Sequence, residues 1–282
     1  MHRPKPLQCG DTVALLAPSG ICDHVKLESG IRTLQNMDLK VQVMESCHAS
    51  HDYLAGPDAL RLRDLHIAFE DHKIKGILAA RGGYGVARLL PYLDYKMISQ
   101  NPKVFVGFSD VTALHIVLNQ FCGLVTFHGP MLASCFADAH PQTLASFKHM
   151  IMEGTGDKLS IRSLYPGTAT GILTGGNLSV IASTLGTPYE IRTRGRILFL
   201  EEIQEAPYRV DRLLLQLKLS GKLSDAAAII FGDFSPESLD SLHVAIEELV
   251  IPEKKPTLWG LPCGHSQPNI TLPLGVTVTV RA

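Results

Sequence analysis

The sequence lacks the features that mark nucleic-acid-binding, membrane and secreted proteins. Its 26 basic residues are balanced by 27 acidic ones, without the excess of Lys and Arg that binding to a phosphate backbone normally requires. The longest apolar runs, such as residues 226–231, fall far short of the roughly 20 residues of a membrane-spanning helix. Residues 1–7 carry positive charges that no apolar stretch follows, which predicts that they are not a signal peptide. We therefore expect a cytoplasmic protein that binds neither nucleic acid nor membrane.

Cysteine and metal-ligand patterns are also sparse. The six cysteines include no CxxC pair, which in a chain of this size indicates reduced thiols rather than a disulfide framework. Cys47, His48 and His51 form one close cluster, but no second pair of ligands follows at a spacing typical of zinc sites. We expect no metal and no cofactor. Hydrophobic residues, at 45%, are ample for a globular core.

Strand-like and helix-like segments alternate through the first half of the chain. This alternation is typical of a mostly parallel, doubly wound α/β sheet, in which ligands bind at the carboxyl ends of the strands. The predicted strands cover residues 12–17, 41–44, 76–80 and 104–108, and the predicted helices cover residues 25–37, 59–69, 86–93 and 111–121. The sharpest loops follow the third and fourth of these strands, so we expect a functional site at that edge of the sheet.

The pattern changes after about residue 155. Runs typical of strands follow at residues 197–200, 227–231 and 274–280, interrupted by one helix at 208–219. The fold class that we predict is α/β, with an N-terminal, mostly parallel, doubly wound domain and a C-terminal β-rich, barrel-like domain. The predicted domains cover residues 1–158, which carry the candidate nucleophile, and residues 170–282, which carry the candidate acid and histidine.

A serine stands directly between a predicted strand and a predicted helix, in residues 107–112 (GFSDVT). A turn of this kind lifts the hydroxyl of Ser109 clear of the sheet and directs the first N–H groups of the helix at the group that the hydroxyl attacks. Such donors stabilise a developing oxyanion. The run departs from the G-x-S-x-G signature, because Val111 replaces the second glycine. The alternative is that Ser109 simply caps the helix.

A glycine-rich loop, residues 81–85 (RGGYG), follows the strand predicted at 76–80. Its spacing fits neither a dinucleotide-binding loop nor a Walker loop. Glycines let backbone amides approach a ligand closely, so the loop favours donation to an oxyanion or a carboxylate, with Arg81 or Arg88 as a nearby cation. The alternative is a tight turn that needs glycine for steric reasons.

Two adjacent glutamates and a late histidine complete the candidate constellation. Glu201 and Glu202 follow the apolar run at 197–200, and His265 lies in a loop bounded by glycine and proline. Serine, acid and histidine in this order occur in triad hydrolases, where the histidine takes the proton of the serine. Because side chains alternate along a strand, only one of the two glutamates can face the histidine. Taken singly, the glutamates also fit a solvated strand end and His265 fits a surface position.

An ordered set of motifs resembles the LD-carboxypeptidase family of serine peptidases. The motifs are residues 10–11 (GD), 17–19 (APS), 80–85 (ARGGYG), 107–115 (GFSDVTALH), 175–178 (GGNL), 200–208 (LEEIQEAPY), 211–212 (DR), 264–265 (GH) and 272–275 (LPLG). Together they span nearly the whole chain, which makes the resemblance far more specific than any single motif.

The resemblance implies an active site between an N-terminal α/β domain and a C-terminal barrel-like domain. It implies a catalytic triad of Ser109, Glu201 and His265. The backbone N–H groups of Asp110 and of Gly83 are the oxyanion donors that it implies. We prefer Glu201 to its neighbour because it directly ends the apolar run.

The same loop supplies the substrate-binding residues that we expect, Arg81, Gly82 and Tyr84. The resemblance implies a cytoplasmic homodimer that releases the terminal D-alanine from murein tetrapeptides in cell-wall recycling, by cutting an L-to-D peptide bond. A related branch hydrolyses microcin C-type peptidyl-nucleotides and confers self-immunity. The chain has little room for the extra loop associated with that branch, so the murein branch is favoured.

Two other classes of function stay open on the residues alone. The first is a nucleotide-dependent enzyme that uses the glycine loop, although neither phosphate-binding fingerprint is present. The second is a non-catalytic binding module that keeps the fold and uses Ser109 only as a helix cap.

Overall fold

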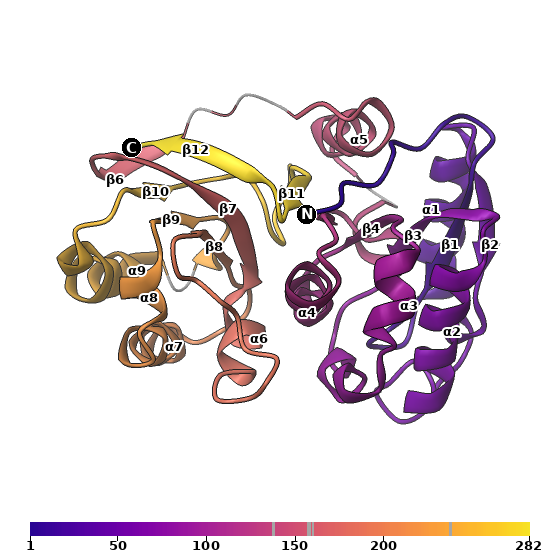
Figure 1. Ribbon diagram of the computed structural model, residues 1–282, viewed down its shortest axis with the longest axis horizontal. Helices are drawn as coiled ribbons and strands as arrows, with labels where there is room; N and C mark the ends of the chain where they lie inside the picture. The colour runs from indigo at the N-terminus through magenta and orange to yellow at the C-terminus, as the bar shows by residue number, and fades with distance from the viewer. Residues whose placement is uncertain (137–138, 157–158, 160, 237–238) are drawn as a thin grey trace.

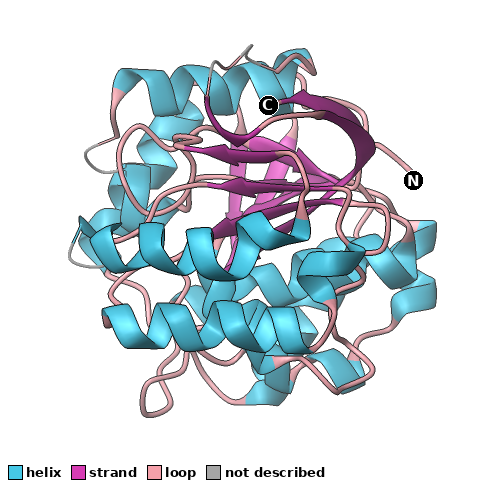
Figure 2. Ribbon diagram, turned by 90° about the vertical axis from the view of Figure 1, so that its left-hand side faces the viewer, coloured by secondary structure: helices cyan, strands magenta, loops and turns pink. Residues whose placement is uncertain are grey.

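Two six-stranded sheets with their covering helices lie side by side in the computed structural model of this chain (Figure 1). The structure describes residues 1–136, 139–156, 159, 161–236 and 239–282. Figure 2, turned by 90°, shows the strands gathered at the centre with helices around them. Within these ranges no helix has the length and apolar character needed to cross a membrane.

The first sheet has the strand order β11-β5-β4-β3-β1-β2. Its parallel strands are β1 (Thr12–Leu16), β2 (Lys40–Val43), β3 (Ile74–Ala79), β4 (Val104–Gly107) and β5 (Thr126–His128). The sixth strand, β11 (Leu272–Leu274), comes from near the end of the chain and pairs antiparallel with β5.

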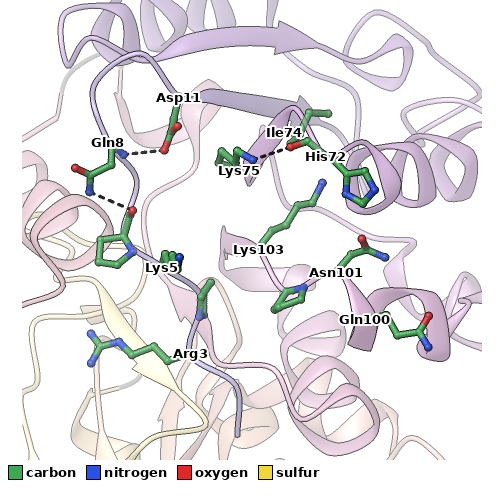
Figure 3. A pocket seen from close by; sticks show the side chains of 13 residues that line it. Arg3, Lys5, Gln8, Asp11, His72, Ile74, Lys75, Gln100, Asn101 and Lys103 are labelled. Atoms are coloured by element: carbon green, nitrogen blue, oxygen red, sulfur yellow. Dashed lines mark hydrogen bonds between the residues drawn. The ribbon is translucent and has the colours of Figure 1, made fainter.

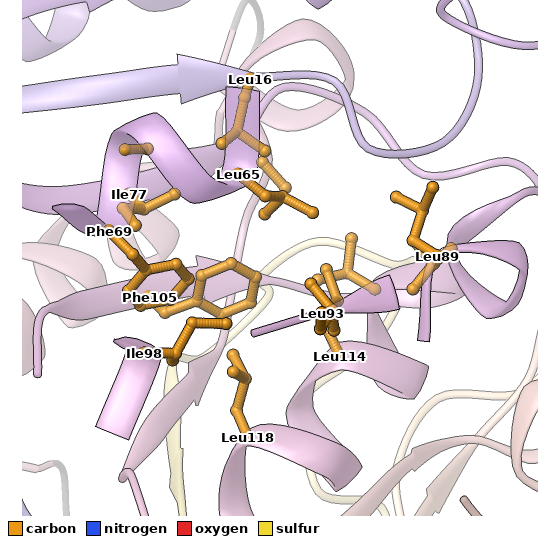
Figure 4. Close-up of a cluster of buried hydrophobic side chains, with 14 of the residues drawn as sticks. Leu16, Leu65, Phe69, Ile77, Leu89, Leu93, Ile98, Phe105, Leu114 and Leu118 are labelled. Atoms are coloured by element: carbon orange, nitrogen blue, oxygen red, sulfur yellow. The ribbon is translucent and has the colours of Figure 1, made fainter. Parts of the chain in front are cut away.

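Helices cover both faces of this sheet, because its central strands are apolar on both sides. Phe105 packs on one face with the ring of Phe69, and these rings lie in the cluster drawn in Figure 4. Val104 and Val106, its neighbours in β4, pack on the other face. The helices of the first face are α2 (Asp58–Glu70), α3 (Tyr95–Gln100) and α4 (Thr112–Cys122). Those of the second face are α1 (His24–Gln35) and α5 (Pro141–Lys148).

The second sheet has the strand order β12-β7-β8-β9-β10-β6 and curls over one of its faces (Figure 1). Its strands are β6 (Arg162–Tyr165), β7 (Thr168–Asn177), β8 (Ile197–Glu201), β9 (Ala228–Phe231), β10 (Thr257–Trp259) and β12 (Thr277–Arg281). Strands β7 to β10 are parallel, and the edge strands β6 and β12 pair antiparallel. The predicted fold class, a doubly wound N-terminal part with a barrel-like C-terminal part, is confirmed.

The expectation of a single helix in the C-terminal half is wrong. The helices that cover the second sheet are α6 (Leu178–Ser183), α7 (Pro207–Leu219), α8 (Lys222–Asp225) and α9 (Leu239–Ala245). Of these, α7 is the predicted one. Two of the others, α6 and α8, have only six and four residues, too short for a repeating apolar period to stand out in the sequence. The third, α9, continues directly into the π turn Ile246–Val250 and is not explained by its length.

The predicted helix at residues 86–93 and the predicted strand at 274–280 are both divided in the structure. The first is two separate 3₁₀ turns, Val86–Arg88 and Leu90–Tyr92, because Pro91 lacks the N–H that a continuous helix would need. The second is divided at Gly275, whose φ of 90° turns the chain from β11 in the first sheet into β12 in the second. One short segment therefore links both sheets.

Remaining short turns connect these elements. They are the 3₁₀ turns Glu45–Cys47, Ser109–Val111 and Ile251–Glu253, and the π turns Leu132–Phe136, His149–Glu153 and Ile246–Val250. Residue 158, where we expect the N-terminal domain to end, lies outside the described residues.

The carboxyl end of β4 in the first sheet meets the ends of β7 and β8 in the second. The backbone N–H of Asn177, at the end of β7, donates to Thr112 Oγ1 at the start of α4 over 3.0 Å. Phe108, just after β4, packs its ring against that of His265, with 4.7 Å between centroids. Loops that follow parallel strands of both sheets are therefore brought to one place, the kind of edge where α/β proteins bind ligands.

Candidate active site

Ser109 lies in the sharp turn that links β4 to α4, and its backbone is in the left-handed region, with φ of 62°. An L-residue other than glycine adopts this conformation at a cost of about 1–2 kcal/mol, so the surrounding structure must hold it there. The same turn leaves the serine half-buried although its neighbours Phe108 and Asp110 are buried. Such a strained strand-to-helix turn is typical of an exposed nucleophile.

The alternative that Ser109 caps α4 does not fit the structure. The residue before α4 is Val111, and the residue before the 3₁₀ turn Ser109–Val111 is Phe108; neither cap position makes a side-chain hydrogen bond. Among the described residues no hydrogen bond joins Ser109 Oγ to the His265 ring either. In ligand-free enzymes such a contact is often long and shortens only when substrate binds.

The glycine loop that follows β3 packs directly against Ser109. A Cβ atom built on Gly82 would lie 2.9 Å from both Cβ and Oγ of Ser109, closer than side chains approach. The Gly82 carbonyl accepts a hydrogen bond of 3.0 Å from the N–H of Gly20, in the loop after β1. Because a peptide unit is planar and trans, this bond directs the N–H of Gly83 away from Gly20. The glycine at position 82 is therefore required by the close approach of the serine.

Replacing Gly82 with alanine should lower kcat by about 10²-fold or more and also lower the melting temperature, because the overlap with Ser109 Cβ forces the turn to shift. Gly82 does not need a positive φ, so the backbone tolerates alanine, and the added methyl group displaces Ser109 instead. The measurement is kcat together with the melting temperature of the variant. The matched control is Gly186→Ala, because a Cβ there meets open space but the φ of 78° is strained. That control should melt earlier and keep its activity; the reverse pattern would contradict this view of Gly82.

His265 and Glu201 are joined by a hydrogen bond at the end of β8. Nδ1 of His265 lies 2.8 Å from Oε2 of Glu201, and the glutamate side chain is fully buried while the imidazole is 18% exposed. Since a carboxylate only accepts, Nδ1 carries the proton and donates it, which leaves Nε2 free to act as a base. The ring of Phe108 supports the imidazole from the side, in a T-shaped contact.

Glu202 points away from the histidine. Its carboxylate accepts hydrogen bonds from Asn177 Nδ2 at 3.0 Å, from the N–H of Ser179 at 2.7 Å and from the N–H of Ile203 at 3.0 Å. Burial raises the pKa of Glu202, and these hydrogen bonds oppose that rise. Because side chains alternate along the strand, Glu201 and Glu202 point in different directions, and only Glu201 faces His265.

Asp233, which belongs to none of the sequence motifs, lies beside the pair formed by His265 and Glu201. It follows β9, and its Oδ2 accepts the N–H of Ser266, the residue after His265, at 3.1 Å. Burial raises the pKa of Asp233, the Ser266 N–H lowers it and the charge of Glu201 raises it again. The carboxyl group thereby tethers the histidine loop. The available signal was its position, two residues after a predicted buried strand at the same sheet edge.

A buried arginine organises the loops around the glycines. Nε of Arg61, in α2, donates to the Gly56 carbonyl at 3.2 Å, and Nη1 donates to the carbonyls of Gly85, at 3.0 Å, and Pro18. Its Nη2 is paired with Asp58. The guanidinium is fully buried and lies so close that a Cβ on Gly85 would be 2.8 Å from Nη1. One side chain therefore fixes three separate loops.

The other residues named from the sequence lie on or beside the same loop. Arg81 is exposed, and its guanidinium donates to the carbonyl of Ile21. Tyr84 is 55% exposed. The Asp110 side chain is buried and accepts the N–H of Val86 at 3.0 Å, which ties the turn of Ser109 to the end of the glycine loop.

A cavity of about 670 Å³ lies elsewhere, at the amino ends of the first sheet's strands (Figure 3). Its lining includes Lys103, whose ammonium group donates to the carbonyls of Ala68 and Asp71 at the carboxyl end of α2. Burial lowers the pKa of Lys103 to about 8, and the charges of Asp71 and Lys75 act on it in opposite directions. The lysine thus caps α2. Across the described ranges no group of three or more His, Cys, Asp or Glu could hold a metal ion.

Comparison with known proteins gives one consistent result. Residues 13–129 match the family model described as the LD-carboxypeptidase N-terminal domain, and residues 170–280 match the LD-carboxypeptidase C-terminal domain. The probable murein peptide carboxypeptidase of Bacillus subtilis is 43% identical over 99% of this chain and 92% of its own length.

Two solved structures extend the likeness to the fold. The muramoyltetrapeptide carboxypeptidase from Oxalobacter formigenes is 32% identical with a TM-score of 0.85, over 96% of this chain and 95% of its own. The microcin C7 self-immunity protein MccF, in complex with aspartyl sulfamoyl adenosine, is 26% identical with a TM-score of 0.88, over 99% of this chain and 95% of its own.

Proposed function

This chain belongs to the LD-carboxypeptidase family, and we propose that it is a serine peptidase that releases the terminal D-alanine of murein tetrapeptides. The observation that carries the assignment of residues is the strained turn of Ser109 at the sheet edge where Glu201 holds His265 over 2.8 Å. The matches to both family models and to the Bacillus subtilis relative confirm the resemblance inferred from the ordered motifs at the level of the family.

The proposed reaction is acyl transfer through a Ser109–Glu201–His265 triad. Nε2 of His265 takes the proton of Ser109 as Oγ attacks the carbonyl that precedes the terminal D-residue, and a tetrahedral oxyanion forms. The C–N bond then breaks, and His265 gives the proton to the departing amine. Water, deprotonated by the same histidine, attacks the acyl carbon of the acyl-enzyme. The bond from that carbon to Ser109 Oγ then breaks, His265 returns the proton to Oγ, and the shortened peptide leaves. Glu201 holds the ring and stabilises the imidazolium in both steps.

Backbone N–H groups of Asp110 and Gly83 are the proposed oxyanion donors. Support for Gly83 comes from the hydrogen bond between the Gly20 N–H and the Gly82 carbonyl, which fixes the orientation of that peptide unit. Preorganised donors of this kind contribute about 3–4 kcal/mol each to the stabilisation of a transition state.

Arg81, Gly82 and Tyr84 are the proposed substrate-binding residues. The guanidinium of Arg81 is held near the loop by the carbonyl of Ile21 yet stays exposed, so it is placed to receive the free carboxylate of the substrate. Gly82 leaves room beside the nucleophile, and Tyr84 extends from the same loop.

The test is release of D-alanine from a murein tetrapeptide and from the same peptide with a C-terminal amide. The wild-type enzyme should cut the free acid and scarcely cut the amide, and Arg81→Ala should lose most of that preference while keeping its fold. Equal cleavage of acid and amide by the wild-type enzyme would contradict carboxylate recognition. Failure of the folded enzyme to release any D-alanine would overturn the proposed function.

A second candidate function is hydrolysis of a microcin C-type peptidyl-nucleotide. The observation that favours it is the likeness of the fold to MccF, with a TM-score of 0.88. We prefer the murein peptide as the substrate, because the chain is 43% identical to the Bacillus subtilis relative and 26% identical to MccF. Cleavage of aspartyl sulfamoyl adenosine at a higher kcat/KM than the tetrapeptide would reverse the order.

The assembly and the location that we propose are a homodimer in the cytoplasm, with domains over residues 1–158 and 170–282. Sedimentation equilibrium of the purified chain tests the dimer, since a single species of 30.7 kDa would contradict it.

A further inference from the structure

Two exposed tyrosines stand together at the rim of the candidate active site. Tyr53 is 56% exposed and Tyr84 is 55% exposed, and their ring centroids lie 5.8 Å apart with 58° between the ring planes. Soluble proteins expose single aromatic rings without consequence, but an exposed pair in contact presents a larger apolar surface to solvent. The triad mechanism uses neither ring.

A tight turn displays Tyr53 in this position. His51 and Leu54 exchange two backbone hydrogen bonds, of 2.8 and 3.0 Å, with Asp52 and Tyr53 at the tip. Asp52 adopts a φ of 55°, a conformation that a side-chain-bearing residue takes at a cost. Leu54 is buried and forms an isolated bridge with Gly20. The tip is therefore anchored, and its exposed tyrosine is held rather than loosely extended.

The turn that carries Tyr53 is joined to the loop that carries Tyr84. A Cβ on Gly20 would lie 3.0 Å from the Gly82 carbonyl and 3.7 Å from the Tyr53 carbonyl, so the three backbones are in contact. Gly82 in turn packs against Ser109. The tyrosine pair is thus connected to the nucleophile through a short, rigid series of backbone contacts.

We propose that Tyr53 and Tyr84 form a subsite for the sugar ring of a muramoyl-tetrapeptide, a proposal that rests on the proposed function. The departing group is a single D-alanine, so any extended contact must lie on the acyl side of the bond that is cut. On that side three residues separate the bond from the muramoyl group, and in extended conformation they span about 10 Å. In the protein, the two residues from Gly82, beside Ser109, to Tyr84 span up to about 7 Å, and the tyrosine side chain extends further. The ring of Tyr84 can therefore reach the distance at which the muramoyl group would lie.

Tyrosine suits such a ligand chemically. Its ring offers a rigid apolar face to the C–H face of a pyranose, and its hydroxyl bonds to polar groups at the edge. The Arg88 guanidinium is oriented by hydrogen bonds of 2.9 and 3.0 Å from Nε to both carboxylate oxygens of Asp58. Those bonds and the charge of Asp58 raise the pKa of Arg88, so a fixed cation lies four residues along the chain from Tyr84. The surface thereby combines an apolar wall with a polar rim.

The experiment compares N-acetylmuramoyl-tetrapeptide with the free tetrapeptide as substrates. For the wild-type enzyme we expect a higher kcat/KM on the muramoyl form. Tyr53→Ala and Tyr84→Ala should each lower kcat/KM for the muramoyl form about tenfold, chiefly through KM, because the ring binds ground state and transition state alike. With the free tetrapeptide Tyr53→Ala should stay within about twofold of the wild-type enzyme. Tyr84→Ala also removes a proposed contact to the peptide, so it should lower kcat/KM on both substrates, and more on the muramoyl form. Tyr53→Phe should retain most of the preference.

The matched control is Tyr92→Ala, which removes a tyrosine that is 67% exposed and makes no ring contact with either partner in the described chain. Tyr92→Ala should leave kcat/KM unchanged on both substrates. Equal loss on both substrates in Tyr53→Ala, or no loss on either, would overturn the sugar subsite while the carboxypeptidase assignment stands. If the wild-type enzyme cuts neither substrate, the proposed function itself fails, which is a different result.

Discussion

Replacing Ser109 with alanine should reduce D-alanine release by about 10⁴-fold or more. Loss of the proposed nucleophile would remove the acyl-enzyme route and leave only binding and oxyanion stabilisation. Stability should change little, because the Ser109 hydroxyl caps neither the 3₁₀ turn nor α4. The measurement is kcat of the purified variant beside its melting temperature. A variant that folds and retains substantial activity would show that another group is the nucleophile.

Ser109→Gly separates catalysis from strain at the same position. The φ of 62° suits glycine, so this variant should be more stable than Ser109→Ala by about 1 kcal/mol while being equally inactive. Urea unfolding of the two variants gives the difference. Equal stability of the alanine and glycine variants would mean that the turn is not strained at this residue.

Replacing Arg61 with methionine should lower the free energy of unfolding by about 3 kcal/mol and kcat by about 10²-fold in the folded enzyme. The change leaves buried carbonyls of Pro18, Gly56 and Gly85 without donors. It also releases the glycine loop from the guanidinium that holds it. Arg61→Lys should recover only part of either loss, because one ammonium group does not reproduce the planar set of donors. Urea unfolding and kcat measured where each variant is folded test both effects.

Lys103→Met is the matched control for Arg61. Lys103 is also buried, at 6% exposure, and donates to two backbone carbonyls, but it does so at the opposite edge of the sheet. Its loss should destabilise the protein and leave kcat unchanged. If Arg61→Met also left kcat unchanged, the glycine loop would be positioned without the guanidinium, and the role of Arg61 would be confined to stability.

Much of the first sheet could be predicted from the sequence, because its strands are short apolar runs and its longer helices show an apolar period. The run at 104–108 and the helix at 111–121 were expected within a residue or two of β4 and α4. Short elements without such a signal are not predicted: α6 has six residues, α8 has four and β5 has three. The helix predicted at 86–93 is divided in the structure because Pro91 lacks the N–H that a continuous helix would need.

Some residues of the candidate site could be predicted from motifs, and others could not. Motif order alone pointed to Ser109, Glu201 and His265, and the alternation of side chains in a strand required the two glutamates to differ. Which glutamate faces the histidine depends on the approach of the loop after β10 to the end of β8, a contact between segments 64 positions apart. Asp233, Tyr53 and Arg61 carried no motif, because their importance comes from neighbours that are distant in the chain.

The sequence by itself determined the family, the alternation of strands and helices and the residue types of a serine hydrolase, because these depend on local patterns and ordered motifs. Tertiary structure decided the rest. The strained φ of Ser109, the contact of Gly82 with it and the three carbonyls on Arg61 exist only once the carboxyl ends of the two sheets meet. Packing between distant segments fixes these distances, and no local pattern encodes them.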